Sequence, residues 1–424
     1  MKPAALAYPF PVQTSIGRPR RLGRIEFTAL LAMSMALAAL GIDMMLPAFG
    51  AMRSELGLAA DSTEVAGVVT AYFFGLAIAQ VVYGPLADRF GRKPTLYLGY
   101  GVYLFGATAS ALAPDLSWLL VARFVWGLGA AGPRVVTLSV VRDRFEGEAM
   151  ARAMSFIMAV FVLVPVVAPT LGAVVTTVGS WRWVFGICAF LAVVMAAWAT
   201  RLEESLDPAN RMELRFGRVI EAARHVITHR QTLGYTLALT SLFGVFTSYL
   251  ASSEIIFGEV FDAADQFPLL FGGLAAVMGC AMLANAFVVG HFGTRRIAHF
   301  TLIAYLVAAI GFLGLATVTG GRPPLAAFMV GLALMLVSHA LLIPNFNTIA
   351  MDPMGSVAGT ASAVIGTIST AGGALIGAII DRSFDGTIVP MTVGFVGLGV
   401  AALGFVLWAE RGHLFRPLRP PVNV

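Results

Sequence analysis

Long runs of apolar residues alternate with short polar stretches along almost the whole chain. A helix that crosses the hydrocarbon core of a bilayer needs about 20 mostly apolar residues, and the runs approach or exceed that length. They predict twelve spans, at residues 28–49, 65–83, 95–112, 116–141, 151–178, 183–200, 232–256, 268–289, 298–318, 325–349, 357–380 and 388–408. The pattern therefore predicts an all-α membrane protein with twelve transmembrane helices.

The largest polar stretch, residues 201–230, lies between the sixth and seventh runs and mixes acidic with basic side chains. It predicts a linker that contains an amphipathic surface helix. The chain then divides into an N-terminal tail (1–26), a first six-helix half (27–200), the linker (201–230), a second six-helix half (231–409) and a C-terminal tail (410–424).

An internal repeat supports two related halves. The segment Gly290-His291-Phe292-Gly293-Thr294-Arg295 aligns with Asp88-Arg89-Phe90-Gly91-Arg92-Lys93, about half the chain away. The second copy keeps the Phe, the Gly and a basic residue but lacks the acid. Two pseudo-symmetric six-helix halves indicate alternating access around a site near the middle of the membrane.

The composition agrees with this pattern, because 58% of the residues are hydrophobic and 12% are charged, against about 25% charged in soluble proteins. Cys188 and Cys280 both lie in apolar runs and offer neither a disulfide framework nor a metal site. The sequence contains no evident pair of nucleophile and base and no phosphate-binding loop. An enzyme is therefore not expected, and neither a metal nor another cofactor is expected.

The distribution of Lys and Arg predicts the orientation, since these residues favour the cytoplasmic side of short loops. With both termini in the cytoplasm, the loops on the opposite side carry only Arg53, Arg182, Arg322 and Arg382. The net charge of +5 is therefore a topology signal rather than a sign of nucleic-acid binding. The arginines at positions 18, 20, 21 and 24 are expected to attract anionic membrane lipids.

Several segments resemble motifs of a known family. Residues 84–94 resemble the signature loop between helices two and three of the major facilitator superfamily, residues 123–131 its helix-four motif, and residues 165–173 the helix-five motif of its antiporters. Residues 42–48, 180–185 and 358–363 are similar to the Bcr/CflA group of bacterial drug/proton antiporters.

The resemblance implies a multi-pass, monomeric protein of the bacterial inner membrane. Its expected activity is proton-coupled efflux of drugs or small amphipathic compounds by alternating access. Two alternatives stay open: a proton-coupled or facilitative carrier of a specific metabolite, and a non-transporting membrane receptor or assembly factor on the same fold. The expected partners are protons, a small-molecule substrate and membrane lipids.

Asp43 is a candidate proton carrier, because it lies in an apolar run where a charged aspartate costs roughly 2.5–3.5 kcal/mol. An apolar environment favours the neutral form of a carboxyl group. Arg123 lies about 9 Å below the periplasmic edge and Asp43 about 10 Å, so the two are predicted to form a proton-coupling pair. The alternatives are a carboxylate wetted at a helix end and an arginine bound to backbone carbonyls.

Arg134 follows Arg123 by eleven residues, which returns it to within about 20° of the same helix face, about 16 Å deeper. Both arginines are then predicted to face one cavity and to favour anionic substrates. Alternatively, Arg134 snorkels toward the cytoplasm near Arg142. Small residues are usual at this position in the Bcr/CflA group. The cavity is also predicted to include Tyr249, Phe246, Asn285 and His339, for which core packing is the alternative.

The signature loop is predicted to form a cytoplasmic gate from Gly84, Asp88, Arg89, Gly91, Arg92 and Arg142. The two glycines permit a tight turn, Arg92 is expected at the lipid surface, and Asp88 accepts hydrogen bonds from a helix N-terminus or pairs with Arg142. These contacts are expected only when the cytoplasmic face is closed. A simple topological stop signal would explain the basic residues but not the acid.

The helix-five motif is predicted to act through the backbone. Pro165 and Pro169 each remove one hydrogen bond from the same helix face, and Gly172 allows a neighbouring helix to approach closely. A bent, tightly packed helix that seals one side of the cavity is expected, as the resemblance to antiporters implies. Without that resemblance, the motif indicates packing alone.

Overall fold

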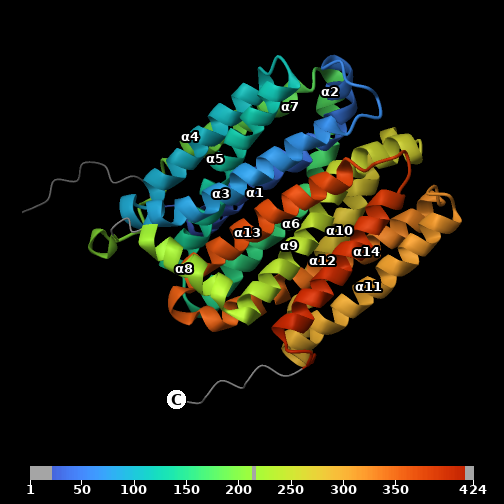
Figure 1. Ribbon diagram of the computed structural model, residues 1–424. Coiled ribbons are helices and arrows are strands. Elements are labelled where there is room, and N and C mark those ends of the chain that lie inside the picture. The colour runs from blue at the N-terminus through green and yellow to red at the C-terminus, as the bar shows by residue number, and fades with distance from the viewer. Residues whose placement is uncertain (1–21, 213–215, 416–424) are drawn as a thin grey trace, which may run out of the picture.

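The computed structural model describes residues 22–212 and 216–415, and every long element in them is a helix (Figure 1). The first half contains α1 (Arg24–Asp43), α3 (Gly67–Phe90), α4 (Arg92–Ala111), α5 (Leu116–Arg144), α6 (Gly147–Val178) and α7 (Arg182–Ala199). The second contains α9 (Arg230–Ile255), α10 (Phe267–Phe292), α11 (Thr294–Val318), α12 (Leu325–Met351), α13 (Ala358–Asp381) and α14 (Val389–Ala409). The twelve-helix fold in two halves is confirmed. Most of the predicted N-terminal tail and the end of the C-terminal tail lie outside the described residues.

Eleven segments of the described chain are long and apolar enough to cross a membrane, and α4 is the long helix that misses this criterion. Tyrosines lower its apolar character, but their hydroxyl groups are satisfied inside the protein. Tyr97 donates to the carbonyl oxygen of Ala196, and Tyr103 donates to that of Leu37 at 2.9 Å. A polar helix is tolerated here because its polar atoms find protein partners rather than lipid.

Shorter helices extend or connect the spans. After Asp43, the 3-10 turn η1 (Leu46–Ala48) and α2 (Phe49–Glu55) carry the first span further than its apolar run predicts. The predicted amphipathic helix of the linker is α8 (Phe216–Thr228), which packs on α13 and α9 of the second half. Its Ala222 and Val226 are buried, whereas Ile220 is exposed.

Glycines set the closest helix contacts within the first half. A methyl group added at Gly127 of α5 would lie 2.0 Å from the backbone oxygen of Tyr72 of α3, and one added at Gly75 of α3 would lie 2.0 Å from that of Phe124. No side chain fits at such distances, so α3 and α5 pack backbone to backbone. This packing gives the helix-four motif its structural role.

The two halves meet along two helix pairs, α3 with α13 and α6 with α10. Figure 1 shows α3 and α13 side by side. Thr367 of α13 donates a hydrogen bond of 2.7 Å to the carbonyl oxygen of Ala77 of α3. A methyl group added at Gly272 of α10 would lie 2.8 Å from the backbone oxygen of Val166 of α6.

The repeated turn differs in part from the expectation. Helix α3 runs to Phe90, so Gly84 lies inside the helix rather than in a turn. The turn is made by Gly91 alone, at a φ of 107° that strongly favours glycine. Gly293 occupies the matching position between α10 and α11 at a φ of 80°. The apolar run ends at Tyr83, but the helix continues because Leu86 and Ala87 keep its inner face apolar.

Candidate functional site

Arg123 of α5 is fully buried at the centre of the first half. Its Nη1 donates a hydrogen bond of 2.8 Å to the carbonyl oxygen of Gly41, and its Nε donates one of 3.3 Å to that of Val68. The guanidinium carbon lies 4.5 Å from the ring centres of both Tyr72 and Trp126. Carbonyl oxygens and aromatic faces carry partial negative charge, so they stabilise the cation without an acid. Arg123 thereby joins α1, α3 and α5.

Asp43, the last residue of α1, is 5% exposed. The expected ion pair with Arg123 is not formed, because the guanidinium is turned toward Gly41 instead. Asp43 follows Gly41 by two positions, so the two positions point about 200° apart around α1. Equal depth along the membrane normal therefore does not bring the carboxylate and the guanidinium together. Within the described chain, the Asp43 carboxylate accepts no hydrogen bond.

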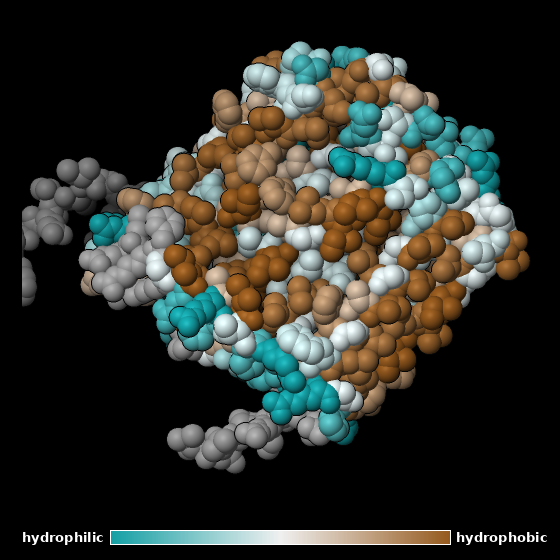
Figure 2. Space-filling view, in the orientation of Figure 1, coloured by the Kyte–Doolittle hydropathy of each residue, from teal (hydrophilic) through white to brown (hydrophobic). Residues whose placement is uncertain are grey.

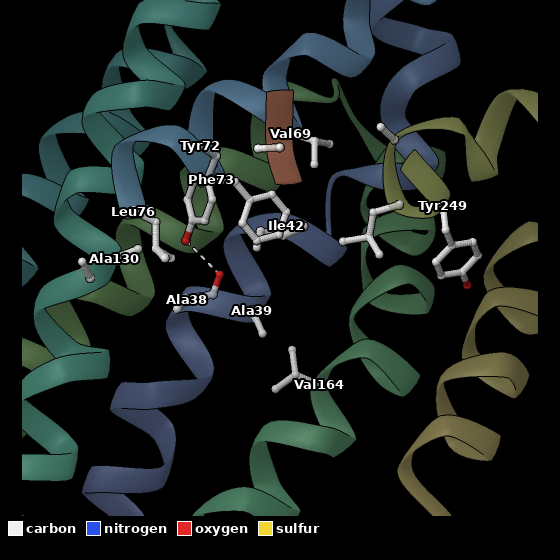
Figure 3. Close-up of a cluster of buried hydrophobic side chains, with 14 of the residues drawn as sticks. Ala38, Ala39, Ile42, Val69, Tyr72, Phe73, Leu76, Ala130, Val164 and Tyr249 are labelled. Atoms are coloured by element: carbon white, nitrogen blue, oxygen red, sulfur yellow. Dashed lines mark hydrogen bonds between the residues drawn. The ribbon is translucent and has the colours of Figure 1, made fainter. Parts of the chain in front are cut away.

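Asp43 lies within electrostatic range of the hydroxyl group of Tyr72, on α3 of the first half, and also of the hydroxyl group of Tyr249, on α9 of the second half. That hydroxyl is buried and has no hydrogen-bond partner in the part of the chain that the structure describes. The Tyr249 ring stacks on Phe271 of α10, with 5.5 Å between the ring centres. Figure 3 shows Tyr72 and Tyr249 on opposite sides of Ile42 in the buried cluster. Asp43 and Tyr249 thus place an uncompensated acid beside an unpaired phenol between the halves.

Arg134 of α5 is half-buried and makes no hydrogen bond or ion pair with any described residue. Its charge lies within electrostatic range of the hydroxyl group of Tyr72. Side chains of a helix tilt toward its N-terminus, which for α5 is the predicted periplasmic end. This arrangement favours the cavity interpretation over snorkelling toward Arg142.

The other predicted cavity residues all lie in the second half, where they make three separate side-chain contacts. Phe246 of α9 stacks on His339 of α12, with ring centres 5.0 Å apart, and the Nδ1 of His339 is buried without a described partner. Tyr249 packs on α10, as described above. Asn285 of α10 accepts a hydrogen bond of 2.8 Å from Asn345 of α12, which satisfies its side-chain oxygen within the protein. The Nδ1 of His339 and the hydroxyl group of Tyr249 are therefore buried polar atoms without a hydrogen-bond partner among the described residues.

The predicted gate has a different pairing from the expected one. Arg92 is 8% exposed rather than at the lipid surface, and its Nη1 donates to Asp88 at 2.5 Å. Its Nε donates to Asp143 at 2.9 Å. Asp88 does not pair with Arg142, which is exposed and donates to the carbonyl oxygen of Leu138. Adjacent residues of a helix point about 100° apart, so Asp143 faces Arg92 while Arg142 faces away.

A second acid, Glu204, completes this cluster. Its carboxylate oxygens accept hydrogen bonds from the backbone N–H groups of Arg92 at 2.9 Å and Lys93 at 3.1 Å, so Glu204 caps the N-terminus of α4. The backbone N–H of Met212 donates to the carbonyl oxygen of Asp88 at 3.0 Å. All these contacts lie within the first half and the start of the linker, whereas Arg89 is exposed. The acidic residues of the linker are visible in the sequence, but Glu204 and its partner Arg92 lie more than 100 residues apart, so their contact was not predicted.

The helix-five motif makes the expected close contact. Pro165 and Pro169 lie inside α6, and a methyl group added at Gly172 would lie 1.9 Å from the backbone oxygen of Met44. Met44 directly follows Asp43. The motif therefore fixes the backbone beside the candidate proton carrier.

The sequence did not predict an ion pair that joins the two halves. Arg53 of α2 donates from Nη2 to both carboxylate oxygens of Glu254 of α9, at 2.8 Å each. The side chains are 8% and 15% exposed. This pair closes the end of the bundle that we predict to face the periplasm. The pair was missed because Arg53 reads as an ordinary loop residue and the partners are 201 residues apart.

These features define a multi-pass helical carrier with buried charges between two repeated halves. The profile of the Major Facilitator Superfamily matches residues 31–377, and the chain belongs to this family. It is accordingly a transporter and not an enzyme.

Two named relatives confirm the resemblance to the Bcr/CflA group. The bicyclomycin resistance protein homolog of Haemophilus influenzae is 26% identical over 86% of this chain and 91% of its own length. Multidrug resistance protein D of Escherichia coli is 21% identical over 92% of this chain and 95% of its own length. An uncharacterized MFS-type transporter, YdgK of Bacillus subtilis, is 28% identical over 90% and 95% of the two chains.

Solved structures show the same fold. The xylose transporter XylE from E. coli, in a partially occluded inward-open conformation, matches with a TM-score of 0.70 at 12% identity over 91% of this chain and 98% of its own. The human organic anion transporter MFSD10 matches with a TM-score of 0.64 at 16% identity over 92% and 100% of the two chains.

Replacement of Arg92 is expected to destabilise the first half. Arg92→Ala leaves Asp88 and Asp143 without their cation, which should lower the free energy of unfolding by about 1–3 kcal/mol. Arg142→Ala is the matched control, since Arg142 contacts only its own helix and is exposed. Thermal unfolding of the purified variants in detergent measures the difference. Equal melting temperatures for the two variants would show that the ion pairs of Arg92 do not stabilise the first half.

Removal of Arg53 is expected to loosen the predicted periplasmic end. A hydrogen bond between charged groups contributes about 1.5–3 kcal/mol, so Arg53→Ala should raise the labelling rate of a cysteine placed at Ala251 about tenfold. The reagent is a membrane-impermeant maleimide, in a background with Cys188 and Cys280 replaced. Arg322→Ala, at an exposed arginine on the same side, should leave the rate unchanged. Unaltered labelling in Arg53→Ala would show that the ion pair does not hold this end closed.

Proposed function

We propose that this protein is a proton-coupled exporter of drugs or small amphipathic compounds that works by alternating access. The observation that carries the proposal is Asp43, a buried carboxylate without a described partner that faces the second half. The names of the relatives, bicyclomycin resistance protein homolog and multidrug resistance protein D, support the substrate class. We place the protein in the bacterial inner membrane as a monomer with both termini in the cytoplasm, and the halves at 27–200 and 231–409.

Asp43 is suited to carry the proton because nothing described neutralises its charge. An ionised carboxylate in a dry apolar site is costly, so closure of the site around Asp43 favours the protonated acid. Access of water to the open site favours release of the proton. The two conformations thereby differ in their affinity for the proton, and this difference is the condition for a proton to drive a conformational change.

The remaining residues have different roles in the transport cycle. Arg123 holds α1 in place through Gly41 rather than exchanging with the proton. The Arg53–Glu254 pair closes the predicted periplasmic end and must separate when that end opens. The Arg92 cluster keeps the cytoplasmic ends of α3, α4 and α5 together while the first half moves as one unit. Phe246, His339, Tyr249 and Arg134 provide an aromatic and polar surface for the substrate.

A proton-coupled or facilitative carrier of a specific metabolite is the second candidate. The unpaired charge of Arg134 and the unpaired Nδ1 of His339 favour it, since fixed polar groups suit a small anionic ligand better than a varied set of drugs. Both candidates use the same fold and proton site. Expression of the chain in an efflux-deficient bacterium distinguishes the two candidates. A drug exporter should give resistance to many compounds, whereas a carrier of a specific metabolite should not.

Replacement of the candidate proton carrier separates coupling from folding. Asp43→Asn keeps the shape of the side chain but cannot ionise, so drug export driven by a pH gradient in proteoliposomes should fall to the background rate. Asp61→Asn, at an exposed acid in the loop after α2, should keep the wild-type rate. Drug-dependent proton flux at the wild-type rate in the Asp43 variant would exclude Asp43 as the essential carrier.

Replacement of Arg134 tests the charge of the substrate site. Arg134→Ala removes a positive charge from a site of low dielectric, where charge acts strongly on a ligand. Resistance to an anionic drug should fall about tenfold relative to a cationic drug, which corresponds to ~1.4 kcal/mol. Parallel susceptibility tests with an anionic, a neutral and a cationic drug measure this ratio. An equal loss for all three would show that Arg134 does not select substrates.

A further inference from the structure

A cavity lies between α3 and α5 of the first half and α13 of the second, and none of the residues of the candidate proton site lines it. It has a volume of about 550 Å³ and lies near the predicted periplasmic ends of these helices. Its wall is mostly apolar and includes Phe74, Leu120, Phe124 and Leu375. Leu375 is 51% exposed, so the cavity is an open crevice on the side of the bundle. Figure 2 shows that the face containing α3 and α13 is largely hydrophobic.

Asp381, at the end of α13, supplies the buried charge of this crevice. It is 4% exposed and also lines a smaller space that reaches Arg53 and Ser252. Its Oδ1 accepts a hydrogen bond from the hydroxyl group of Ser252, and the hydroxyl group of Ser248 also lies close to the carboxylate. No ion pair joins Asp381 to Arg53, whose Nη2 instead binds both oxygens of Glu254. A nearly dry carboxylate thus faces an apolar cavity without a paired cation.

The rim adds one acid and one base. Glu64 and Arg382 both line the crevice and are exposed to solvent. Their charges offset each other and are screened by water. The buried carboxyl group of Asp381 favours its neutral form in an empty apolar site, and a cation beside it favours the ionised form, so this side chain makes the crevice selective for a cation. The rings of Phe74 and Phe124 lie 6.5 Å apart at an angle of 39°. Aromatic faces of this kind attract organic cations.

We propose that this crevice binds an amphipathic organic monocation at a site separate from the central cavity. The apolar body lies on Phe74, Phe124 and Leu375, and the positive charge lies at Asp381. The volume falls in the range of about 300–1,000 Å³ that ligand pockets occupy. A lipid acyl chain is the competing occupant, but it would leave the carboxylate uncompensated.

Binding of tetraphenylphosphonium to the full-length protein in phosphatidylcholine nanodiscs tests the proposal. Asp381→Asn, whose side-chain oxygen still accepts from Ser252, should weaken binding at least about tenfold, as expected for the loss of one charged partner. Tetraphenylborate, measured separately, has the same shape and the opposite charge. It should bind the wild type more weakly than the cation does, and Asp381→Asn should remove this difference.

Leu375→Trp fills the crevice from a half-exposed position and keeps the test valid if the Asp381 variant fails to fold. It should also weaken tetraphenylphosphonium binding about tenfold. Val400→Trp, on the exposed face of α14, is the matched control and should change nothing. Phe246→Ala distinguishes the two cavities and should leave this binding unchanged.

Two results would overturn the proposal. One is unaltered cation binding in Leu375→Trp with loss of binding in Phe246→Ala, which would assign the cation to the central cavity. The other is equal binding of both probes to the wild type and to Asp381→Asn, which would indicate an apolar groove for lipid. Drug export driven by a pH gradient is measured in the same variants, so either failure is distinguishable from failure of the proposed exporter function.

Discussion

The position of α1 depends on one buried cation. Arg123 binds the backbone of α1 through Gly41 and that of α3 through Val68, between the rings of Tyr72 and Trp126. A guanidinium in a membrane protein is costly unless its donors find acceptors, and here Nε and Nη1 each donate to a carbonyl oxygen, while Nη2 has no hydrogen-bond partner among the described residues. Because Arg123 contacts backbone oxygens and aromatic rings rather than an acid, Asp43 has no ion-pair partner among the described residues. In the first half, Arg123 thus fixes the packing of the helices, while Asp43 remains free to take up and release a proton.

The number, the order and the approximate bounds of the helices could be predicted from the sequence, because span length follows from bilayer thickness. Gly91 and Gly293 were also predictable as matching turns. Depth along the membrane could be estimated from residue spacing, but direction around a helix could not be estimated without the neighbours. This is why Asp43 and Arg123 were placed level with each other and paired, although the structure turns them apart.

Ion pairs between distant segments could not be predicted for a different reason. Arg92 pairs with Asp143, Glu204 caps α4, and Arg53 binds Glu254, and each contact depends on how helices far apart in the sequence meet. In a hydropathy plot, Asp143 and its neighbour Arg142 are both strongly polar residues at the end of the same apolar run. Only the packing of α5 against α4 decides which of them faces Arg92. The polar residues of the second half, such as Asn285 with Asn345, follow the same rule.

The bond between Met212 and Asp88 sets a mechanical limit on the whole molecule. Met212 is held by the first half, whereas α8, which begins at Phe216, packs on the second. Chain of this length spans at most about 14 Å when fully extended. This short linker limits how far the predicted cytoplasmic ends of the two halves can separate, unless the hydrogen bond of Met212 breaks or α8 leaves the second half.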